Sequence, residues 1–247
     1  MTQPHDRIRE WWDADAHVYD DAAGHALSDP VEAAVWRHIL ERSLPSAPAR
    51  LLDVGTGTGS LAFAAAELGF DVTGVDLSEG MLERARAKAV ARGARIEFVH
   101  GAAESPPPGP FDAVIERHVL WTIPDPVAAL TAWRAVTTPG GRLVLLEGSW
   151  GGEGPFVAAT DALARLVERA YGIPDHHHET YPDDLPLPLQ GLHDPAPFVG
   201  VVHEAGWERI RIARLRDVEW AIERRQRWPL GPLTRRARYA IIADAPR

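Results

Sequence analysis

The amino-acid sequence predicts a doubly wound α/β fold, in which parallel strands alternate with helices. Residues 50–54 (RLLDV) are a short apolar run, residues 55–59 (GTGTG) are a glycine-rich turn, and residues 60–68 are an alanine-rich helical stretch. The unit then repeats, because a strand-like run over 71–76 is followed by apolar residues at helical spacing over 81–92. Strands and helices that alternate in this way indicate right-handed, parallel βαβ crossovers.

Hydrophobic periodicity predicts the remaining elements. Further strands are expected at 95–99, 111–115, 141–147, 207–215 and 238–243, which gives seven strands in all. Further helices are expected at 7–19, 31–44, 126–136, 160–171 and 197–205. We expect one domain over 1–247, made of an N-terminal helical cap (1–44), a core (45–150), a substrate lid or insertion (151–206) and closing strands (207–247). The His- and Pro-rich stretch 172–197 is the most irregular part of this insertion.

The composition excludes several kinds of chemistry. The 247 residues include no cysteine, which excludes disulfides, cysteine-zinc sites, iron–sulfur clusters and a thiolate nucleophile. Lys88 is the only lysine, which argues against a pyridoxal-phosphate Schiff base and a phosphate-loop ATPase. The net charge of −9 and the absence of a basic run argue against nucleic acid as a partner. Because the sequence shows no signal peptide and no apolar run of about 18 residues, we expect a cytoplasmic protein without a membrane partner.

The glycine-rich turn predicts a ligand that carries no phosphate. A dinucleotide fingerprint needs a third glycine where this chain has Ser60. Asp53 precedes the first glycine by two residues, and its carboxylate would oppose a pyrophosphate but suits a cationic ligand. Asp76 ends the second strand, where a carboxylate can accept both hydroxyls of an adenosine ribose. S-adenosylmethionine meets these demands, because it combines an adenosine with an ammonium and a sulfonium.

Several ordered motifs carry a resemblance to a known family. The stretch LLDVGTGTGSLAFAAAELGFDVTGVDLSEGMLERA, followed by FDAVIERHVLWTIPDP and PGGRLVLLE, resembles class I S-adenosylmethionine-dependent methyltransferases of the small-molecule type. The resemblance is strong over 45–150 and weaker over WWDADAHVYDDAAGHALSDP and ARYAIIADA. It implies a Rossmann-like, mostly parallel sheet with helices on both faces, and S-adenosyl-L-methionine as the cofactor, released as S-adenosyl-L-homocysteine. It also implies in-line transfer of a methyl group to N or O, less often C, of a small metabolite or natural product. The oligomeric state stays open, with a homodimer as one alternative.

The resemblance further implies which residues bind the cofactor. Around the methionine part it places Asp53, Gly55, Thr56, Gly57 and Gly59. Around the adenosine it places Asp76, Leu77, Met81, Ala102, Ala103 and Glu104; the family commonly has an aspartate where Ala102 stands, so backbone or Glu104 would replace it. It places Tyr19 and His25 in an N-terminal segment that closes over the cofactor, and Glu116, Arg117 and His118 at the end of the fourth strand.

Alternatives remain open at the candidate bases and for the chain as a whole. His118 either faces the substrate as a base or orienting donor, or packs as a hydrogen-bonded histidine under the next helix. His25 and the run 176–178, His177 in particular, are the next candidate bases. We expect no metal at this run, because adjacent loop histidines point in different directions. The other readings of the whole chain are an NAD(P)-dependent oxidoreductase and a non-catalytic, methyltransferase-like binding subunit.

Overall fold

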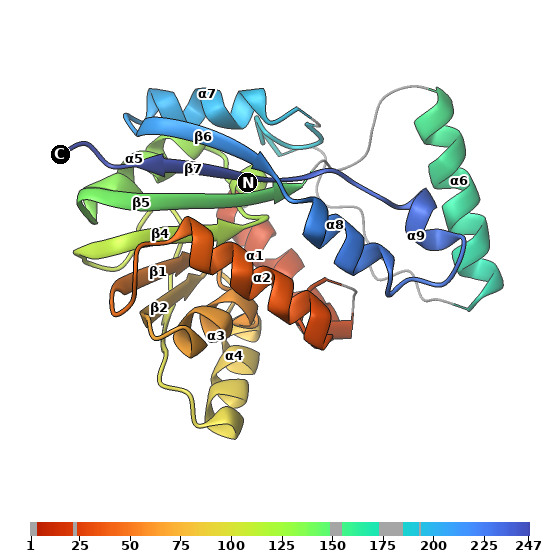
Figure 1. The fold of residues 1–247 in the computed structure, drawn as a ribbon, viewed down its shortest axis with the longest axis horizontal. Helices are drawn as coiled ribbons and strands as arrows, with labels where there is room; N and C mark the ends of the chain where they lie inside the picture. Colours follow the sequence, from red (N-terminus) through yellow and green to blue (C-terminus); the bar gives the residue numbers. More distant parts are fainter. Residues whose placement is uncertain (1–3, 22–23, 149–154, 173–184, 193) are drawn as a thin grey trace.

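The computed structural model describes residues 4–21, 24–148, 155–172, 185–192 and 194–247. Its centre is a seven-stranded sheet with the order β3-β2-β1-β4-β5-β7-β6 (Figure 1). The strands are β1 (Arg50–Val54), β2 (Asp71–Asp76), β3 (Glu97–His100), β4 (Phe111–Arg117), β5 (Thr137–Gly148), β6 (Glu208–Arg214) and β7 (Arg238–Asp244). β7 runs antiparallel to both of its neighbours, and the other pairs are parallel. The predicted Rossmann-like, mostly parallel sheet is therefore confirmed.

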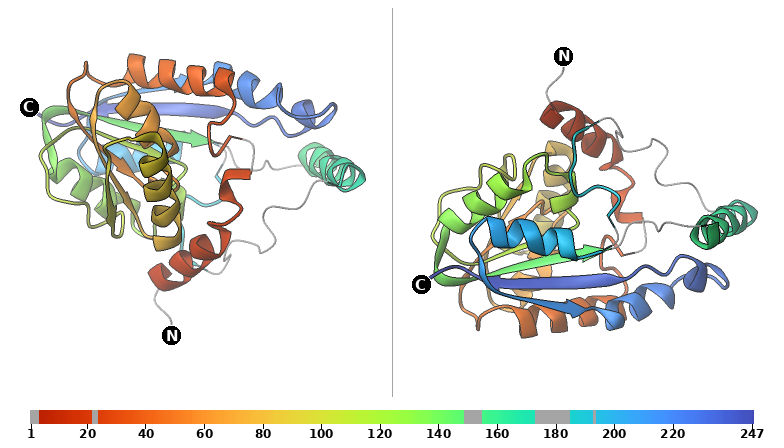
Figure 2. Two further views of the ribbon diagram at one scale, coloured as in Figure 1. Left: turned by 90° about the horizontal axis from the view of Figure 1, so that it is seen from below. Right: turned by 90° about the horizontal axis from the view of Figure 1, so that it is seen from above.

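Helices cover both faces of the sheet, as predicted. They are α1 (Pro4–Asp15), α2 (Pro30–Ser43), α3 (Ser60–Glu67), α4 (Glu79–Arg92), α5 (Pro126–Ala135), α6 (Pro155–Ala170), α7 (Ala196–Glu204), α8 (Arg216–Glu223) and α9 (Leu230–Leu233), with short 3₁₀ turns η1 (Tyr19–Asp21) and η2 (Leu120–Thr122). One apolar cluster joins α2, α3 and α8 to the sheet, and a second joins α5 and α7 to it. In both views of Figure 2, α1 and α2 lie on opposite sides of the sheet, while α6 stands apart from it.

Local sequence signals account for some of the helix ends. The hydroxyl of Ser78 accepts a hydrogen bond from the Met81 N–H, which confirms the predicted N-cap of α4. Gly93 ends this helix in the left-handed region at φ 62°. The predicted helix over 7–19 is instead α1 at 4–15, because the chain turns into η1 at Tyr19. The strand expected from 141 begins at Thr137, which pairs with Phe111 ahead of an irregular step in the ladder.

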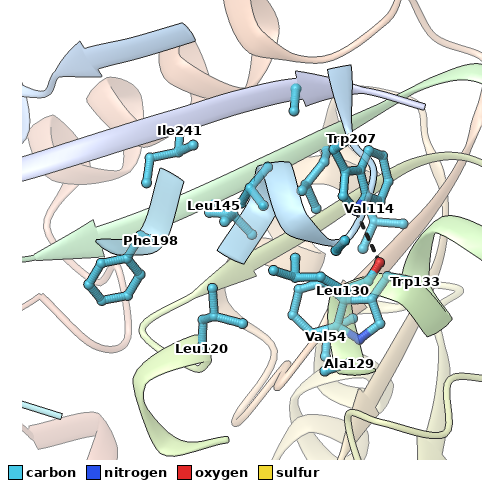
Figure 3. Packing of buried hydrophobic residues seen from close by; sticks show 14 of the residues in the cluster. Val54, Val114, Leu120, Ala129, Leu130, Trp133, Leu145, Phe198, Trp207 and Ile241 are labelled. Carbon is cyan, nitrogen blue, oxygen red and sulfur yellow. Dashed lines mark hydrogen bonds between the residues drawn. The ribbon is translucent and has the colours of Figure 1, made fainter. Parts of the chain in front are cut away.

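Two tryptophans in the second apolar cluster connect α5 to the segments beside it. Figure 3 shows Trp207 donating its indole N–H to the Leu130 carbonyl, at 3.0 Å. Trp133 is fully buried and donates to the Ala103 carbonyl at 2.7 Å. A buried indole N–H needs such an acceptor, so packing of α5 also fixes the loop after β3.

Helix α6 belongs to a part of the chain beside the sheet. Its Asp161 pairs with Arg236, and the hydroxyl of Tyr171, just past its end, donates to the Trp228 carbonyl at 2.9 Å. The predicted lid residues 176–178, including His177, lie outside the described residues. No helix in the described ranges is both long and apolar enough to cross a membrane.

Candidate functional site

A cleft of about 690 Å³, including its part open to solvent, lies at the carboxyl ends of β1, β2 and β4. One group of lining residues comes from the glycine loop, the end of β2, α4 and the loop after β3: Gly55, Gly57, Val75, Asp76, Leu77, Met81, Gly101, Ala103 and Glu104. A second group comes from the N-terminal segment, the end of β4 and the turn that follows it: His5, Ile8, Trp12, Tyr19, Arg117, His118, Val119, Thr122, Ile123 and Pro124. The carboxyl edge of the parallel strands is where open α/β sheets bind ligands.

The glycine loop needs its glycines for two different reasons. Gly55 and Gly57 have φ of 63° and 54°, a region that L residues rarely adopt. A Cβ at Gly55 would lie 2.2 Å from Val119 Cγ2, so a side chain there has no room. A Cβ at Gly57 would have no neighbour closer than Tyr19 Cε1 at 3.9 Å. Gly57 therefore keeps open the space between the loop and Tyr19.

Asp76 joins the end of β2 to the glycine loop. Its Oδ2 accepts from the Gly57 N–H at 2.7 Å, and its Oδ1 accepts from the Ser78 N–H at 2.8 Å. A carboxylate offers about four acceptor positions, so two remain for donors in the cleft. Burial raises the pKa of Asp76 to about 6, against the lowering by these two hydrogen bonds.

Asp53 lies behind the glycine loop, and its side chain lines a separate hollow of about 270 Å³ together with Tyr19 and Arg117. Its Oδ2 accepts from the Thr56 hydroxyl at 2.7 Å. Burial raises its pKa to about 7, while the Thr56 hydrogen bond and the charge of Arg117 lower it. The carboxyl group thus holds the loop through Thr56, whereas Asp76 holds it through Gly57.

The loop after β3 supplies both apolar and acidic surface. Leu77 and Met81 line the cleft beside Ala103, whereas Ala102 is not among the lining residues. The carboxylate of Glu104 lies 2.9 Å from His5 Nε2, which connects this loop to α1. All of the residues predicted to surround the adenosine therefore line the cleft, except Ala102.

The segment that follows α1 is held against the end of β4. Arg117 donates from its two terminal nitrogens to the carbonyls of Gly24 and His25, both at 2.9 Å. The His25 ring stacks on Tyr19 with centroids 4.2 Å apart, and its Nδ1 lies 2.9 Å from the Tyr19 carbonyl. Tyr19 lines the cleft, but His25 does not. His25 therefore packs against Tyr19 without lining the cleft itself.

Hydrogen bonding identifies the tautomer of His118. Its Nε2 lies 2.7 Å from Arg238 Nη1, and arginine can only donate, so Nε2 is the acceptor. Burial and the charge of Arg238 hold the pKa of His118 well below its ordinary value. The neutral ring therefore carries its proton on Nδ1, which lies 3.5 Å from Glu147 Oε2. His118 also has φ 61°, a conformation that is uncommon for a residue with a side chain.

Glu116 is buried and shapes the turn after β4. Its carboxylate accepts from the N–H groups of Val119, Leu120 and Leu146, at 2.8, 3.3 and 3.2 Å. Burial raises its pKa to about 8, against these hydrogen bonds. Its side chain does not line the cleft. A cofactor contact at this position would therefore come from the backbone.

Comparison with known proteins decides the family. The model of the methyltransferase domain matches residues 52–145. A ubiquinone biosynthesis O-methyltransferase of Xanthomonas campestris is 30% identical over 222 residues, which cover 85% of this chain and 86% of the relative. This chain belongs to the class I S-adenosylmethionine-dependent methyltransferases. It is an enzyme, and S-adenosyl-L-methionine is its cofactor.

A further relative and a solved structure are also similar to the methyltransferase. A demethylmenaquinone methyltransferase of Thermus thermophilus is 41% identical over 131 residues, or 51% of this chain and 60% of the relative. Phosphoethanolamine N-methyltransferase 2 of Haemonchus contortus, solved with phosphomonomethylethanolamine and S-adenosylhomocysteine, superposes with a TM-score of 0.69 at 17% identity. That alignment covers 100% of this chain and 61% of the longer protein, and shows the shared fold. No comparison supports the oxidoreductase or the non-catalytic reading.

Sequence reasoning missed much of the apolar side of the methyltransferase cleft. Ile8 reaches it from α1, whose polar and apolar residues are mixed closely enough to conceal this face. Val119 and Ile123 reach it from the turn after β4, inside the motif that carried the resemblance. Arg238 was missed because only the fold brings it to His118. Among the described residues no cluster suited to a metal ion is found.

Proposed function

We propose that this methyltransferase transfers the methyl group to an oxygen of a small, uncharged molecule with a large apolar part. The observation that carries the proposal is the apolar part of the cleft lining, which includes Ile8, Trp12, Val119, Ile123 and Pro124. Apolar walls with few polar groups are typical of sites for small organic ligands. The Xanthomonas relative is an O-methyltransferase of ubiquinone biosynthesis, which supports oxygen as the acceptor atom.

The charges of the cleft also favour an uncharged acceptor. In the described part of the chain, the basic side chains that line it besides His118 are His5, whose Nε2 lies 2.9 Å from Glu104 Oε1, and Arg117, which donates to two carbonyls. His118 is neutral in this geometry. A phosphate or carboxylate on the acceptor would lose water here without gaining a free cation, which is costly.

The cleft residues fit S-adenosylmethionine. We infer that Asp76 accepts the ribose hydroxyls, since it faces the cleft with acceptor positions to spare. Leu77, Met81 and Ala103 would bound the adenine, with Glu104 or the Ala102–Ala103 backbone meeting its amine.

The methionine part would follow the loop that contains Gly55 and Gly57, under Tyr19. Thr56 and Gly59 shape this loop, and Asp53 supplies negative charge behind it. The Glu116 and Arg117 backbone lies at the neighbouring strand end.

The protein's own contribution to the reaction is positioning and exclusion of water. The cofactor supplies a methyl group that is already activated by a positively charged sulfur, so little covalent chemistry is left to the protein. Helix α1 covers the cleft with Ile8 and Trp12, and its Asp13 accepts from the Ser78 hydroxyl at 2.5 Å and the Gly80 N–H at 3.1 Å. These contacts hold α1 at the N-terminus of α4, where a carboxylate is favoured.

We assign His118 an orienting role in place of proton abstraction. A general base needs a free lone pair, whereas Nε2 of His118 already accepts from Arg238. The ring instead forms a neutral, fixed part of the cleft beside Val119. His25 lies outside the cleft lining and His177 outside the described residues, so both remain predictions from sequence.

A labelled acceptor panel tests the proposal. The protein is incubated with methyl-labelled S-adenosylmethionine and matched sets of uncharged phenols, phosphorylated amines and carboxylated phenols. We expect label in one or more uncharged phenols, with rates at least tenfold above those of their charged analogues. Preferential methylation of a phosphorylated amine would contradict the proposal, and an Asp76→Asn control separates enzymatic from spontaneous transfer.

A further inference from the structure

The single lysine of the chain lies where three elements of the proposed cofactor site meet. Lys88 projects from α4, and its Nζ is 2.6 Å from Asp20 Oδ2 and 3.1 Å from the Thr58 carbonyl, to which it donates. Thr58 also contacts Asp20 directly, because its hydroxyl donates to Asp20 Oδ1 at 2.6 Å. We call Lys88, Asp20 and Thr58 the lysine clasp.

The clasp connects the glycine loop to the segment that carries Tyr19. Thr58 stands between Gly57 and Gly59, so both its hydroxyl and its carbonyl belong to the loop. Asp20 directly follows Tyr19, whose Cε1 lies nearest to the space above Gly57. A displacement of Asp20 therefore moves Tyr19 relative to the loop.

Partial burial makes the clasp more than a surface ion pair. The side chains of Lys88 and Asp20 are 24% and 21% exposed, and Thr58 is 1% exposed. Exposed pairs contribute little because water screens them, whereas partly dehydrated, hydrogen-bonded pairs hold geometry better. A lysine suits this place, because a compact ammonium can donate to a carboxylate and a carbonyl that lie in different directions.

We propose that Lys88 is a positioning residue for S-adenosylmethionine, which acts through Asp20 and Thr58 to hold Tyr19 over the glycine loop. The proposal rests on the cofactor site inferred above. It goes beyond that site because Lys88 does not line the cleft. The loss of the clasp should weaken cofactor binding while leaving the sheet and its core in place.

Calorimetric titration with S-adenosylhomocysteine tests the clasp without knowledge of the acceptor. We expect Lys88→Met to raise the Kd about tenfold, and Lys88→Arg, which keeps the charge, to stay within about threefold of the wild-type value. The matched control is Arg86→Met on the same helix, which removes a cation paired with Glu79 at 2.5 Å and should change the Kd less than twofold. Equal effects of Lys88→Met and Arg86→Met would overturn the proposal.

Asp20→Asn provides a second route if Lys88→Met folds poorly. It removes the charge but keeps an oxygen for the Thr58 hydroxyl, so we expect a smaller rise in Kd than for Lys88→Met. The double variant should have the same Kd as Lys88→Met alone. Additive effects would mean that the two residues act separately and would contradict the clasp.

Lysine-selective ¹³C labelling gives one side-chain Cε signal, because the chain has one lysine. That signal should shift on saturation with S-adenosylhomocysteine in the wild type and not in Asp20→Asn; an unchanged wild-type signal would contradict the proposal.

One variant separates failure of the clasp from failure of the cofactor site. Gly57→Val places a branched side chain into the space above the loop, and it should abolish measurable binding if the cofactor lies there. If Gly57→Val binds normally, the site itself is wrong. If Gly57→Val loses binding while both clasp variants keep it, only the clasp is wrong.

Discussion

Replacement of Asp76 by asparagine should weaken S-adenosylhomocysteine binding by about tenfold to about 150-fold. In the wild type, each carboxylate oxygen accepts one backbone N–H, from Gly57 at 2.7 Å and Ser78 at 2.8 Å. Asparagine keeps one oxygen and has an amide NH₂ group, which only donates, in place of the other. This group cannot accept a hydrogen bond from a backbone N–H or from a ribose hydroxyl, so one acceptor is lost. Loss of one charge-assisted hydrogen bond costs about 1.5–3 kcal/mol, which corresponds to that range of Kd.

Isothermal titration at pH 7.5 measures this effect, with Asp71→Asn as the matched control. Asp71 lies exposed at the opposite end of β2, so its replacement should leave the Kd unchanged. Thermal unfolding of both variants shows whether the fold is retained. An unchanged Kd in Asp76→Asn, or an equal loss in Asp71→Asn, would refute the assignment of the ribose to Asp76.

The pH dependence of the same titration adds a second check. Because burial raises the pKa of Asp76 to about 6, the group is mostly ionised at pH 7.5 and mostly protonated at pH 5. Protonation removes acceptor positions, so the wild-type affinity should fall as the pH decreases through 6. Asp76→Asn cannot titrate and should lose much of this dependence.

Three further perturbations have defined outcomes. Burial raises the folded-state pKa of Asp53 from 3.8 to about 7, so its contribution to the free energy of unfolding falls by about 1.4 kcal/mol from pH 6 to pH 8. In urea unfolding at both pH values, the free energy of unfolding of Asp53→Asn should depend less on pH than that of the wild type. Histidine NMR should show no titration of His118 between pH 6 and 8, and Arg238→Met should raise its pKa, since the charge of Arg238 lowers it; ordinary titration in the wild type would argue against the assigned tautomer. Gly55→Ala should destabilise the fold by about 2–4 kcal/mol through its clash with Val119, whereas Gly57→Ala should cost about 1 kcal/mol from its positive φ alone; equal losses in denaturant unfolding would contradict this distinction.

Features that depend on neighbouring residues were predictable from the sequence. The strand, the glycine turn and the helix over 50–68 follow from local periodicity and from the conformational freedom of glycine, and the cap at Ser78 follows from its place before a helical pattern. The position of Asp76 at a strand end was likewise predicted, because a strand pattern also gives the point at which it ends.

Features that depend on the fold were not predictable in this way. His118 and Arg238 are 120 positions apart, and β7 alone brings the guanidinium to the ring. The helix over 216–223 was also not predicted, because its eight residues are fewer than the about 11 to 18 over which a helical pattern is normally recognised. The contacts of Lys88 were not predictable either, because only the fold brings Asp20 and Thr58 beside it.

A crystal structure of the protein with S-adenosylhomocysteine and an uncharged phenol tests the proposed site most directly. We predict that the ribose hydroxyls lie within hydrogen-bonding distance of Asp76, that the sulfur lies in the cleft beside the glycine loop, and that the phenol packs against Ile8 and Val119. Location of the cofactor in the hollow behind the loop, beside Asp53, or ribose contacts that bypass Asp76, would contradict it.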